Sequence, residues 1–260
     1  MNPNSQTHFV YPNAPHTHTI IILHGRDSTA SEFASEFFES QASDERTLPE
    51  IFPFVKWVFP NSGVRTSARF KIKMSQWFDM WSVENPTEQD ELQIVGLKQS
   101  IEQIRLVVEE EAAIIGYKNL FLGGISQGGA TAIMALLVMG VEVGGFLGLC
   151  SWLPFQNVAE ITEDGTNNEV FTKKFKEFLC NGQWDLVENE SESARTPVFL
   201  GHSTDDEGVP IENGLALCCG LRKLGFVCEW KQYEDAGHWV DEPVGVDDIS
   251  EFLKKHGVND

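Results

Sequence analysis

Residues 120–130 read Leu-Phe-Leu-Gly-Gly-Ile-Ser-Gln-Gly-Gly-Ala, and this stretch decides the fold. It begins as an apolar run typical of a buried strand, and after its glycines it continues to Met139 as an apolar run typical of a buried helix. Ser126 stands between the two, flanked by Gly124 and Gly128. A serine in so cramped a turn needs neighbours without side chains. The pattern predicts a nucleophile elbow of the α/β-hydrolase type, with Ser126 as the nucleophile.

Apolar runs of strand length alternate with helical patterns along the rest of the chain. Besides the strand of the elbow, we expect strands at residues 19–23, 55–59, 143–150, 196–202 and 226–233. We expect helices after the capping box Thr29-x-x-Glu32 and within residues 94–108, 130–139, 209–224 and 246–255. This alternation predicts an α/β-hydrolase fold, with a mostly parallel central sheet and helices on both faces.

The chain shows no repeat and no linker that would divide it. We expect residues 19–260 to form a single α/β-hydrolase domain and residues 1–18 to form an N-terminal arm, either flexible or paired as a first edge strand. Residues 64–90 lack clear periodicity and predict a long loop near the site. The acidic stretch 156–193 is expected to be a surface excursion rather than a second domain, and a lid role for it stays open.

Composition excludes several classes of function. The formal net charge of −20 argues against nucleic acid as a partner and against electrostatic docking to an anionic membrane. No apolar run reaches the 18 or so residues of a spanning helix, and the polar start lacks the order of a signal peptide. Five scattered cysteines without C-x-x-C spacing predict reduced thiols in a cytoplasmic protein. We expect neither a metal nor a cofactor.

A serine nucleophile needs a base, and the base needs an acid that orients it. In this fold the order along the chain is Ser, acid, His. His238 follows a glycine in the loop after the last expected strand, which is where the base belongs. Asp205, Asp206 and Glu207 follow the strand before it, and spacing alone leaves the choice among these three acids open.

Two further sets of candidates complete the predicted site. Backbone amides of Gln127, next to the serine, and of Arg26, in the loop after the first buried strand, are the expected oxyanion-hole donors. Large apolar side chains are candidates to line an acyl site, although core packing is the simpler explanation for each; they are Trp77, Trp152, Leu153, Phe155 and Trp239.

Five motifs in order resemble the acyl-protein thioesterase family, also called the lysophospholipase/carboxylesterase family of α/β-hydrolases. The resemblance runs from about residue 19 to residue 255 and rests on Gly124-Ile-Ser-Gln-Gly-Gly129, Trp77-Phe-Asp79, Ser151-Trp-Leu-Pro154, the run from His202 to Val209-Pro210, and Gly237-His238. Counting back from Val209-Pro210 in the family's acid motif puts the acid on Asp206.

The resemblance implies a Ser126-His238-Asp206 hydrolase of carboxylic esters or thioesters, acting on acyl substrates such as S-acylated proteins. The alternatives are a lysophospholipase or short-chain carboxylesterase, and a catalytically silent fold that binds acyl groups. We expect a monomer or weak homodimer. The chain departs from the family's H-G-L-G-D loop, which is one residue shorter here and carries Arg26. It also has a longer acidic stretch and lacks the N-terminal anchoring cysteine.

Overall fold

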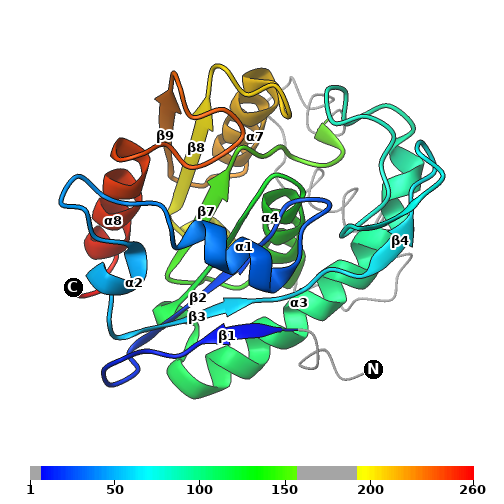
Figure 1. Ribbon diagram of the computed structural model, residues 1–260. Helices are drawn as coiled ribbons and strands as arrows, with labels where there is room; N and C mark the ends of the chain where they lie inside the picture. The colour runs from blue at the N-terminus through cyan, green and yellow to red at the C-terminus, as the bar shows by residue number, and fades with distance from the viewer. Residues whose placement is uncertain (1–6, 157–191) are drawn as a thin grey trace.

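The computed structural model describes residues 7–156 and 192–260. Within them, seven strands form one sheet, in the order β1-β3-β2-β6-β7-β8-β9 (Figure 1). The strands are β1 (His8–Val10), β2 (His18–Leu23), β3 (Val55–Phe59), β6 (Leu120–Ile125), β7 (Gly145–Leu149), β8 (Val198–Ser203) and β9 (Cys228–Tyr233). Neighbours pair in parallel except β1, which runs antiparallel to β3 at the edge. The mostly parallel sheet is confirmed, and within the arm the edge-strand alternative is the one observed.

Helices cover both faces of this sheet (Figure 1). The side chains of β2 alternate between two hydrophobic clusters, because successive side chains of a strand point to opposite faces: Ile20 and Ile22 join one cluster, Ile21 and Leu23 the other. The helices that pack on the first face are α1 (Ala30–Phe37), α2 (Leu48–Ile51) and α8 (Val244–Lys255), and those on the second are α3 (Gln93–Ile115), α4 (Gln127–Met139) and α7 (Ile211–Lys223). This arrangement confirms the predicted layers.

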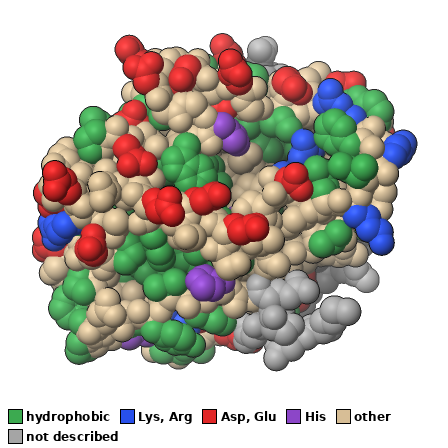
Figure 2. All heavy atoms as spheres, viewed as in Figure 1, with side chains coloured by type: hydrophobic (Ala, Val, Ile, Leu, Met, Phe, Trp, Pro, Cys, Tyr) green, Lys and Arg blue, Asp and Glu red, His purple; other side chains and the backbone are tan. Residues whose placement is uncertain are grey.

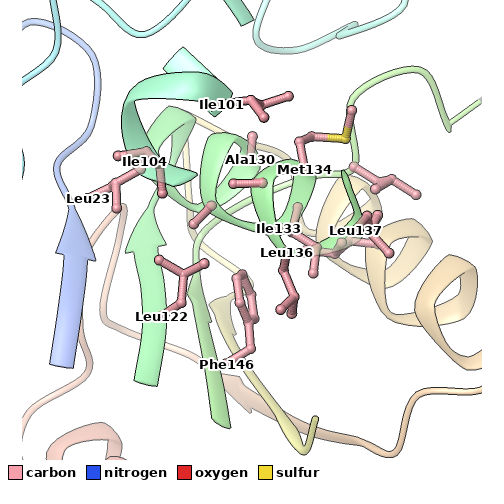
Figure 3. Close-up of a cluster of buried hydrophobic side chains, with 14 of the residues drawn as sticks. Leu23, Ile101, Ile104, Leu122, Ala130, Ile133, Met134, Leu136, Leu137 and Phe146 are labelled. Atoms are coloured by element: carbon pink, nitrogen blue, oxygen red, sulfur yellow. The ribbon is translucent and has the colours of Figure 1, made fainter. Parts of the chain in front are cut away.

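The centre of the second face is α4, the helix of the elbow. Ala130, Ile133 and Leu136 are fully buried, and α4 lies between β6 and α3 (Figure 3). Apolar residues all round the helix predict burial on all sides, and its residues from Gln127 to Leu137 are indeed buried. Of the helices the structure describes, none is both long and apolar enough to cross a membrane.

Residues 64–90 are more regular than expected. A two-stranded hairpin, β4 (Val64–Thr66) and β5 (Lys73–Ser75), lies apart from the main sheet. Its strands are polar and largely exposed, so the alternation that marks a half-buried strand is missing from the sequence.

Two helices differ in length from the expectation. Helix α4 begins at Gln127, three residues before its expected start, and α3 extends seven residues past Val108. Residues 157–191, most of the acidic stretch, lie outside the described residues.

The elbow is held by direct backbone contact between α4 and β2. A Cβ atom added to Gly128 would lie 2.3 Å from the carbonyl oxygen of Leu23 and 2.4 Å from that of His24. One added to Gly124 would lie 2.6 Å from the carbonyl carbon of Gly128. Neither approach leaves room for a methyl group, so both glycines are required by packing rather than by a positive φ.

We therefore expect Gly128→Ala to destabilise the fold by about 3 kcal/mol or more, since overpacking against backbone cannot be relieved by a rotamer change. In an unconstrained helix the same change is stabilising by up to about 1 kcal/mol, so the predicted sign is opposite to helix propensity. The control is Gly63→Ala, whose added Cβ would meet only a side-chain atom of Arg65 at 3.9 Å. Urea unfolding measures both; equal midpoints would contradict the prediction.

Candidate active site

Ser126 occupies the turn between β6 and α4 in a strained backbone conformation, with φ 56° and ψ −127°. Its amide donates to the carbonyl of Leu149 at 2.9 Å, and its carbonyl accepts from Ser151 Oγ at 2.9 Å and from the amide of Ala130 at 3.0 Å. Strain of this kind persists only where the surroundings fix it. Ser126 is 8% exposed, and it lines a cavity of about 370 Å³.

The predicted site residues follow the carboxyl ends of parallel strands, where open α/β sheets bind ligands. Arg26 comes after β2, Ser126 after β6, Asp206 after β8 and His238 after β9. His238, Arg26, Gln127 and Ser126 line the same cavity. The structure thus gathers side chains that lie up to about two hundred residues apart in the sequence.

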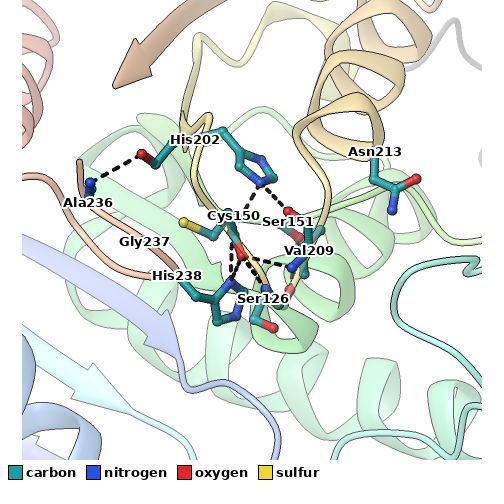
Figure 4. Close-up of polar contacts among 12 residues, drawn as sticks. Ser126, Cys150, Ser151, His202, Val209, Asn213, Ala236, Gly237 and His238 are labelled. Carbon is teal, nitrogen blue, oxygen red and sulfur yellow. Dashed lines mark hydrogen bonds and ion pairs between the residues drawn. The ribbon is translucent and has the colours of Figure 1, made fainter. Parts of the chain in front are cut away.

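His238, whose polar contacts are drawn as dashed lines in Figure 4, forms a close pair with Asp206. Nδ1 of His238 lies 2.8 Å and 2.9 Å from the two carboxylate oxygens, so Nδ1–H donates and Nε2 is left for other contacts. The Asp206 carboxylate is fully shielded from solvent, whereas the His238 ring is 35% exposed. This is the arrangement in which an acid fixes the tautomer of a catalytic base.

Asp206 is held by more donors than His238 alone. The amides of Gly208 and Val209 each donate to Oδ1 at 2.8 Å, and Nε2 of His202 lies 3.2 Å from Oδ2. Burial opposes ionisation of the carboxyl, but the hydrogen bonds from His202, His238 and the Val209 amide outweigh it and hold the pKa of Asp206 well below its usual range. The site therefore keeps a buried carboxylate in its charged form.

The structure also separates the three acids that spacing left open. Asp205 accepts a hydrogen bond from the Gly237 amide at 2.9 Å and another from Ser203 Oγ, so it ties the base loop to β8. Glu207 is exposed. Of the three, Asp206 is the one whose carboxylate contacts His238, in agreement with the register that the resemblance implied.

The side chain of Gln127, the residue after the serine, is held by hydrogen bonds to the backbone of Trp77 and Phe78. Its side-chain oxygen accepts from the Trp77 amide at 2.8 Å, and its side-chain nitrogen donates to the Phe78 carbonyl at 2.8 Å. Gln127 is the first residue of α4, and backbone N–H groups in the first turn have no partner within the helix. Its amide is therefore suitable for a developing oxyanion, with the helix N-terminus behind it.

The loop that carries Arg26 is braced by a buried histidine. The Ser62 amide donates to Nε2 of His24 at 3.0 Å, so Nδ1 carries the proton and donates to the Gly25 carbonyl at 2.7 Å. Desolvation lowers the pKa of His24, which suits this neutral tautomer. In the sequence, His24 and His202 stand only at the ends of two expected strands. Their bracing contacts are set by tertiary structure and leave no mark in the spacing.

Some of the candidates for the acyl site line the cavity, and the others lie in the core. Trp152 and Trp239 line the cavity. Trp77, Leu153 and Phe155 are buried in the core and are not among the residues that line it; Trp77 Nε1 donates to the His24 carbonyl at 2.8 Å. Liners that the sequence reasoning missed include Phe33, Met80 and Val83. Phe33 lies on the helix expected after the capping box, where a core face and a cavity wall give the same apolar pattern.

One group among the described residues could offer three ligand atoms to a metal ion. Cys150 Sγ, an Asp206 oxygen and a His238 ring nitrogen lie within 4.8 Å of one another. Burial raises the pKa of the Cys150 thiol, and Asp206 adds to this shift. A neutral thiol beside a carboxylate that already accepts several hydrogen bonds is a poor ligand set for Zn²⁺, which binds thiolates.

Fold and site define a hydrolase of the α/β type. The family model described as Phospholipase/Carboxylesterase matches residues 4–194. The chain therefore belongs to this family of ester hydrolases, and the resemblance inferred from the five motifs is confirmed. The match ends before Asp206 and His238, so the pairing of these two residues stands on the geometry above.

Relatives of known name extend along nearly the whole chain. Acyl-protein thioesterase 1 of Gibberella zeae is 28% identical over 255 residues, which cover 95% of this chain and 94% of that protein. A probable inactive carboxylesterase of Oryza sativa is 26% identical and covers 88% of this chain and 80% of its own. Among solved structures, Zea mays acyl-protein thioesterase 2 superposes with a TM-score of 0.71 at 23% identity, over 96% of this chain and 98% of that one. This last likeness concerns the fold alone.

The low pKa of Asp206 predicts how stability depends on pH. A carboxyl whose pKa is depressed by folding contributes stability above its unfolded pKa of about 3.9, and that contribution is lost as pH falls toward the folded pKa. Between pH 5 and pH 2.5, the free energy of unfolding should therefore fall more steeply in the wild type than in Asp206→Asn, by about 1–3 kcal/mol. Urea unfolding at each pH measures this, with exposed Glu207→Gln as the control. Parallel curves for wild type and Asp206→Asn would refute it.

Proposed function

We propose that this protein hydrolyses carboxylic esters or thioesters of acyl substrates through a Ser126-His238-Asp206 triad. The observation that carries the proposal is a strained serine that shares a cavity with a histidine whose other ring nitrogen is held by a buried carboxylate. Family membership supports the class of reaction. The relatives named as thioesterases support thioesters among the substrates.

The proposed reaction proceeds in two halves. Ser126 Oγ attacks the acyl carbonyl while His238 Nε2 takes its proton, and Asp206 stabilises the imidazolium that forms. The amides of Gln127 and Arg26 receive the oxyanion. His238 then protonates the leaving alcohol or thiol. Water attacks the acyl-enzyme with His238 as base, and the acid product leaves.

The cavity suggests the class of acyl group. Its wall combines polar groups with the apolar side chains of Phe33, Met80, Val83, Trp152 and Trp239. Its volume of about 370 Å³ lies near the lower end of the range of about 300–1,000 Å³ for small-molecule sites. The substrates proposed from the family are S-acylated proteins or lysophospholipids. The modest volume favours the alternative of a short-chain carboxylesterase.

Ser126→Ala should lower kcat/KM for p-nitrophenyl butyrate by about 10⁴-fold or more, since the nucleophile is lost while binding remains. A fluorophosphonate should add one covalent mass to the wild type and none to this variant, as measured on the intact protein. The control is Ser31→Ala on the exposed face of α1, which should label and turn over as the wild type does. Failure of the wild type to label would favour a silent fold, a state that the inactive Oryza relative makes worth testing.

Chain length separates the two substrate classes. We expect kcat/KM on p-nitrophenyl esters to peak at short or medium acyl chains and to fall for palmitate, because the cavity is small. A palmitoyl thioester is assayed beside this series. Rates that rise continuously with chain length, and that are highest for the thioester, would contradict the short-chain alternative and favour a long-chain thioesterase.

A further inference from the structure

Arg26 carries a charged head whose hydrogen-bonding capacity is not fully used. The residue lines the cavity beside Ser126, and its guanidinium carbon lies 5.5 Å from the centroid of the Phe70 ring. Within the described residues, its Nη1 is shielded from solvent and has no hydrogen-bond partner. Desolvation lowers the pKa of Arg26, and the neighbouring charge of Arg69 lowers it further. A buried donor on a cation without a partner is unfavourable, so this position calls for an explanation.

Three other arginines show a contrast, whereas Arg65 also has a shielded nitrogen, Nε, with no hydrogen-bond partner among the described residues. Arg105 contacts both Glu102 and Glu109 on its own helix, Arg46 contacts Asp44, and Arg69 lies 3.8 Å from Glu84. These are exposed or half-exposed side chains with carboxylate partners. Arg26 is more enclosed, yet its Nη1 has no hydrogen-bond partner among the described residues. The neighbouring charges of Asp27, Asp79 and Glu84 act on the pKa of Arg26 in the direction opposite to desolvation. Asp79 accepts from the Ala68 amide, and Glu84 accepts from Ser82.

The surface beside Arg26 is cationic, although the protein as a whole is strongly acidic. Residues 64–78, which include the hairpin β4–β5, contain Arg65, Arg69, Lys71 and Lys73 and no acid. The guanidinium carbon of Arg69 lies 5.4 Å from the centroid of the Phe70 ring. Two guanidinium groups, those of Arg26 and Arg69, therefore contact the same ring. In Figure 2, Lys and Arg side chains gather on the side of the molecule where β4 lies in Figure 1, while Asp and Glu are spread over much of the remaining face. Such a local field attracts anions to this side.

The backbone of the loop after β2, which carries Arg26, lies next to Ser126. A Cβ atom added to Gly25 would lie 3.5 Å from Cβ and 4.0 Å from Oγ of Ser126, and Arg26 is the next residue. Adjacent Cα atoms are about 3.8 Å apart, and an arginine has several rotatable bonds between Cα and its head. Because Arg26 and Ser126 line the same cavity, a group bound by the guanidinium would share that cavity with the carbonyl that Ser126 attacks. Its planar fork suits carboxylate and phosphate oxygens.

We propose that Arg26 makes this enzyme selective for esters that carry an anionic group, a carboxylate or a phosphate, a few bonds from the scissile carbonyl. The inference rests on the proposed hydrolase function and deepens it, because it names a substrate class for the same cavity. The anion belongs either to the acyl part or to the leaving alcohol. Glu36, which also lines the cavity, disfavours an anion on its own side and so leaves the Arg26 side as the place for it.

Matched ester pairs test the proposal. On the acyl side, 4-nitrophenyl hydrogen adipate is compared with 4-nitrophenyl methyl adipate; on the leaving-group side, 4-acetoxybenzoate is compared with its methyl ester. Each kcat/KM is divided by the rate constant of base hydrolysis of the same compound. We expect the anionic ester to be preferred in at least one pair, and Arg26→Met to lower that anionic-to-neutral ratio by about 10- to 100-fold, the usual effect of a charge-assisted hydrogen bond.

Three variants keep the test specific. Arg105→Met makes the same change in net charge on α3, away from the cavity, and should leave the ratio within twofold of the wild type. The double variant Lys71→Met/Lys73→Met weakens the field of the hairpin without touching Arg26, and it should lower the ratio less than Arg26→Met does. Arg26→Lys keeps the charge but loses the fork, and it should recover part of the ratio.

The outcomes separate this inference from the function beneath it. If the wild type hydrolyses the neutral esters but shows the same ratio as Arg26→Met, the anion selectivity is refuted and the hydrolase stands. A ratio lowered equally by Arg105→Met, or more by the lysine pair than by Arg26→Met, would replace a direct contact with a long-range field and would also overturn the proposal. If the wild type hydrolyses neither member of either pair and Ser126 does not label, the proposed function fails, and the inference fails with it.

Discussion

The structure of the site depends on one steric constraint, the contact of α4 with the backbone of β2. Gly128 approaches the carbonyl oxygens of Leu23 and His24 so closely that no side chain fits. This contact sets the height of the helix N-terminus above the sheet, and with it the position of the Gln127 amide. It also brings the loop after β2, with Gly25 and Arg26, against Ser126. Ser126 and the backbone of Arg26 and Gln127 are thus placed by the same packing.

A second layer of polar contacts makes this placement rigid. Trp77 links the two sides, since its indole donates to the His24 carbonyl and its amide to the Gln127 side chain. His24 in turn braces Gly25, and His202 braces Asp206. Each contact joins backbone or side-chain groups that are buried and would be unfavourable if left unpaired. Aromatic and histidine residues that could be taken for substrate-binding groups therefore hold Gly25, Gln127 and Asp206 in place.

The sequence predicted the layers and most elements, because hydrophobic periodicity and the elbow are local patterns, and it pointed to Ser126 and His238, which line one cavity. It could not choose among Asp205, Asp206 and Glu207 without the resemblance, since a carboxylate's partner depends on how two loops meet. It also did not distinguish Trp77 from Trp152, although the first is core and the second lines the cavity. The hairpin β4–β5 was missed because its exposed, polar strands have no buried face to mark them.

The net charge of the protein and the local charge at the cavity affect different kinds of anion. The value of −20 describes the interaction of the whole protein with an extended polyanion, and screening confines the field of each exposed group to about 8 Å in physiological salt. Arg26 lines the cavity together with Glu36, and Arg69 contacts the same Phe70 ring as Arg26, so these groups count for more at the site than acids on the far side of the fold. A small anionic substrate is short enough to respond to this local field, whereas an extended anionic surface also meets the acidic remainder. The same charge distribution therefore disfavours a polyanion and favours a small anion at the site.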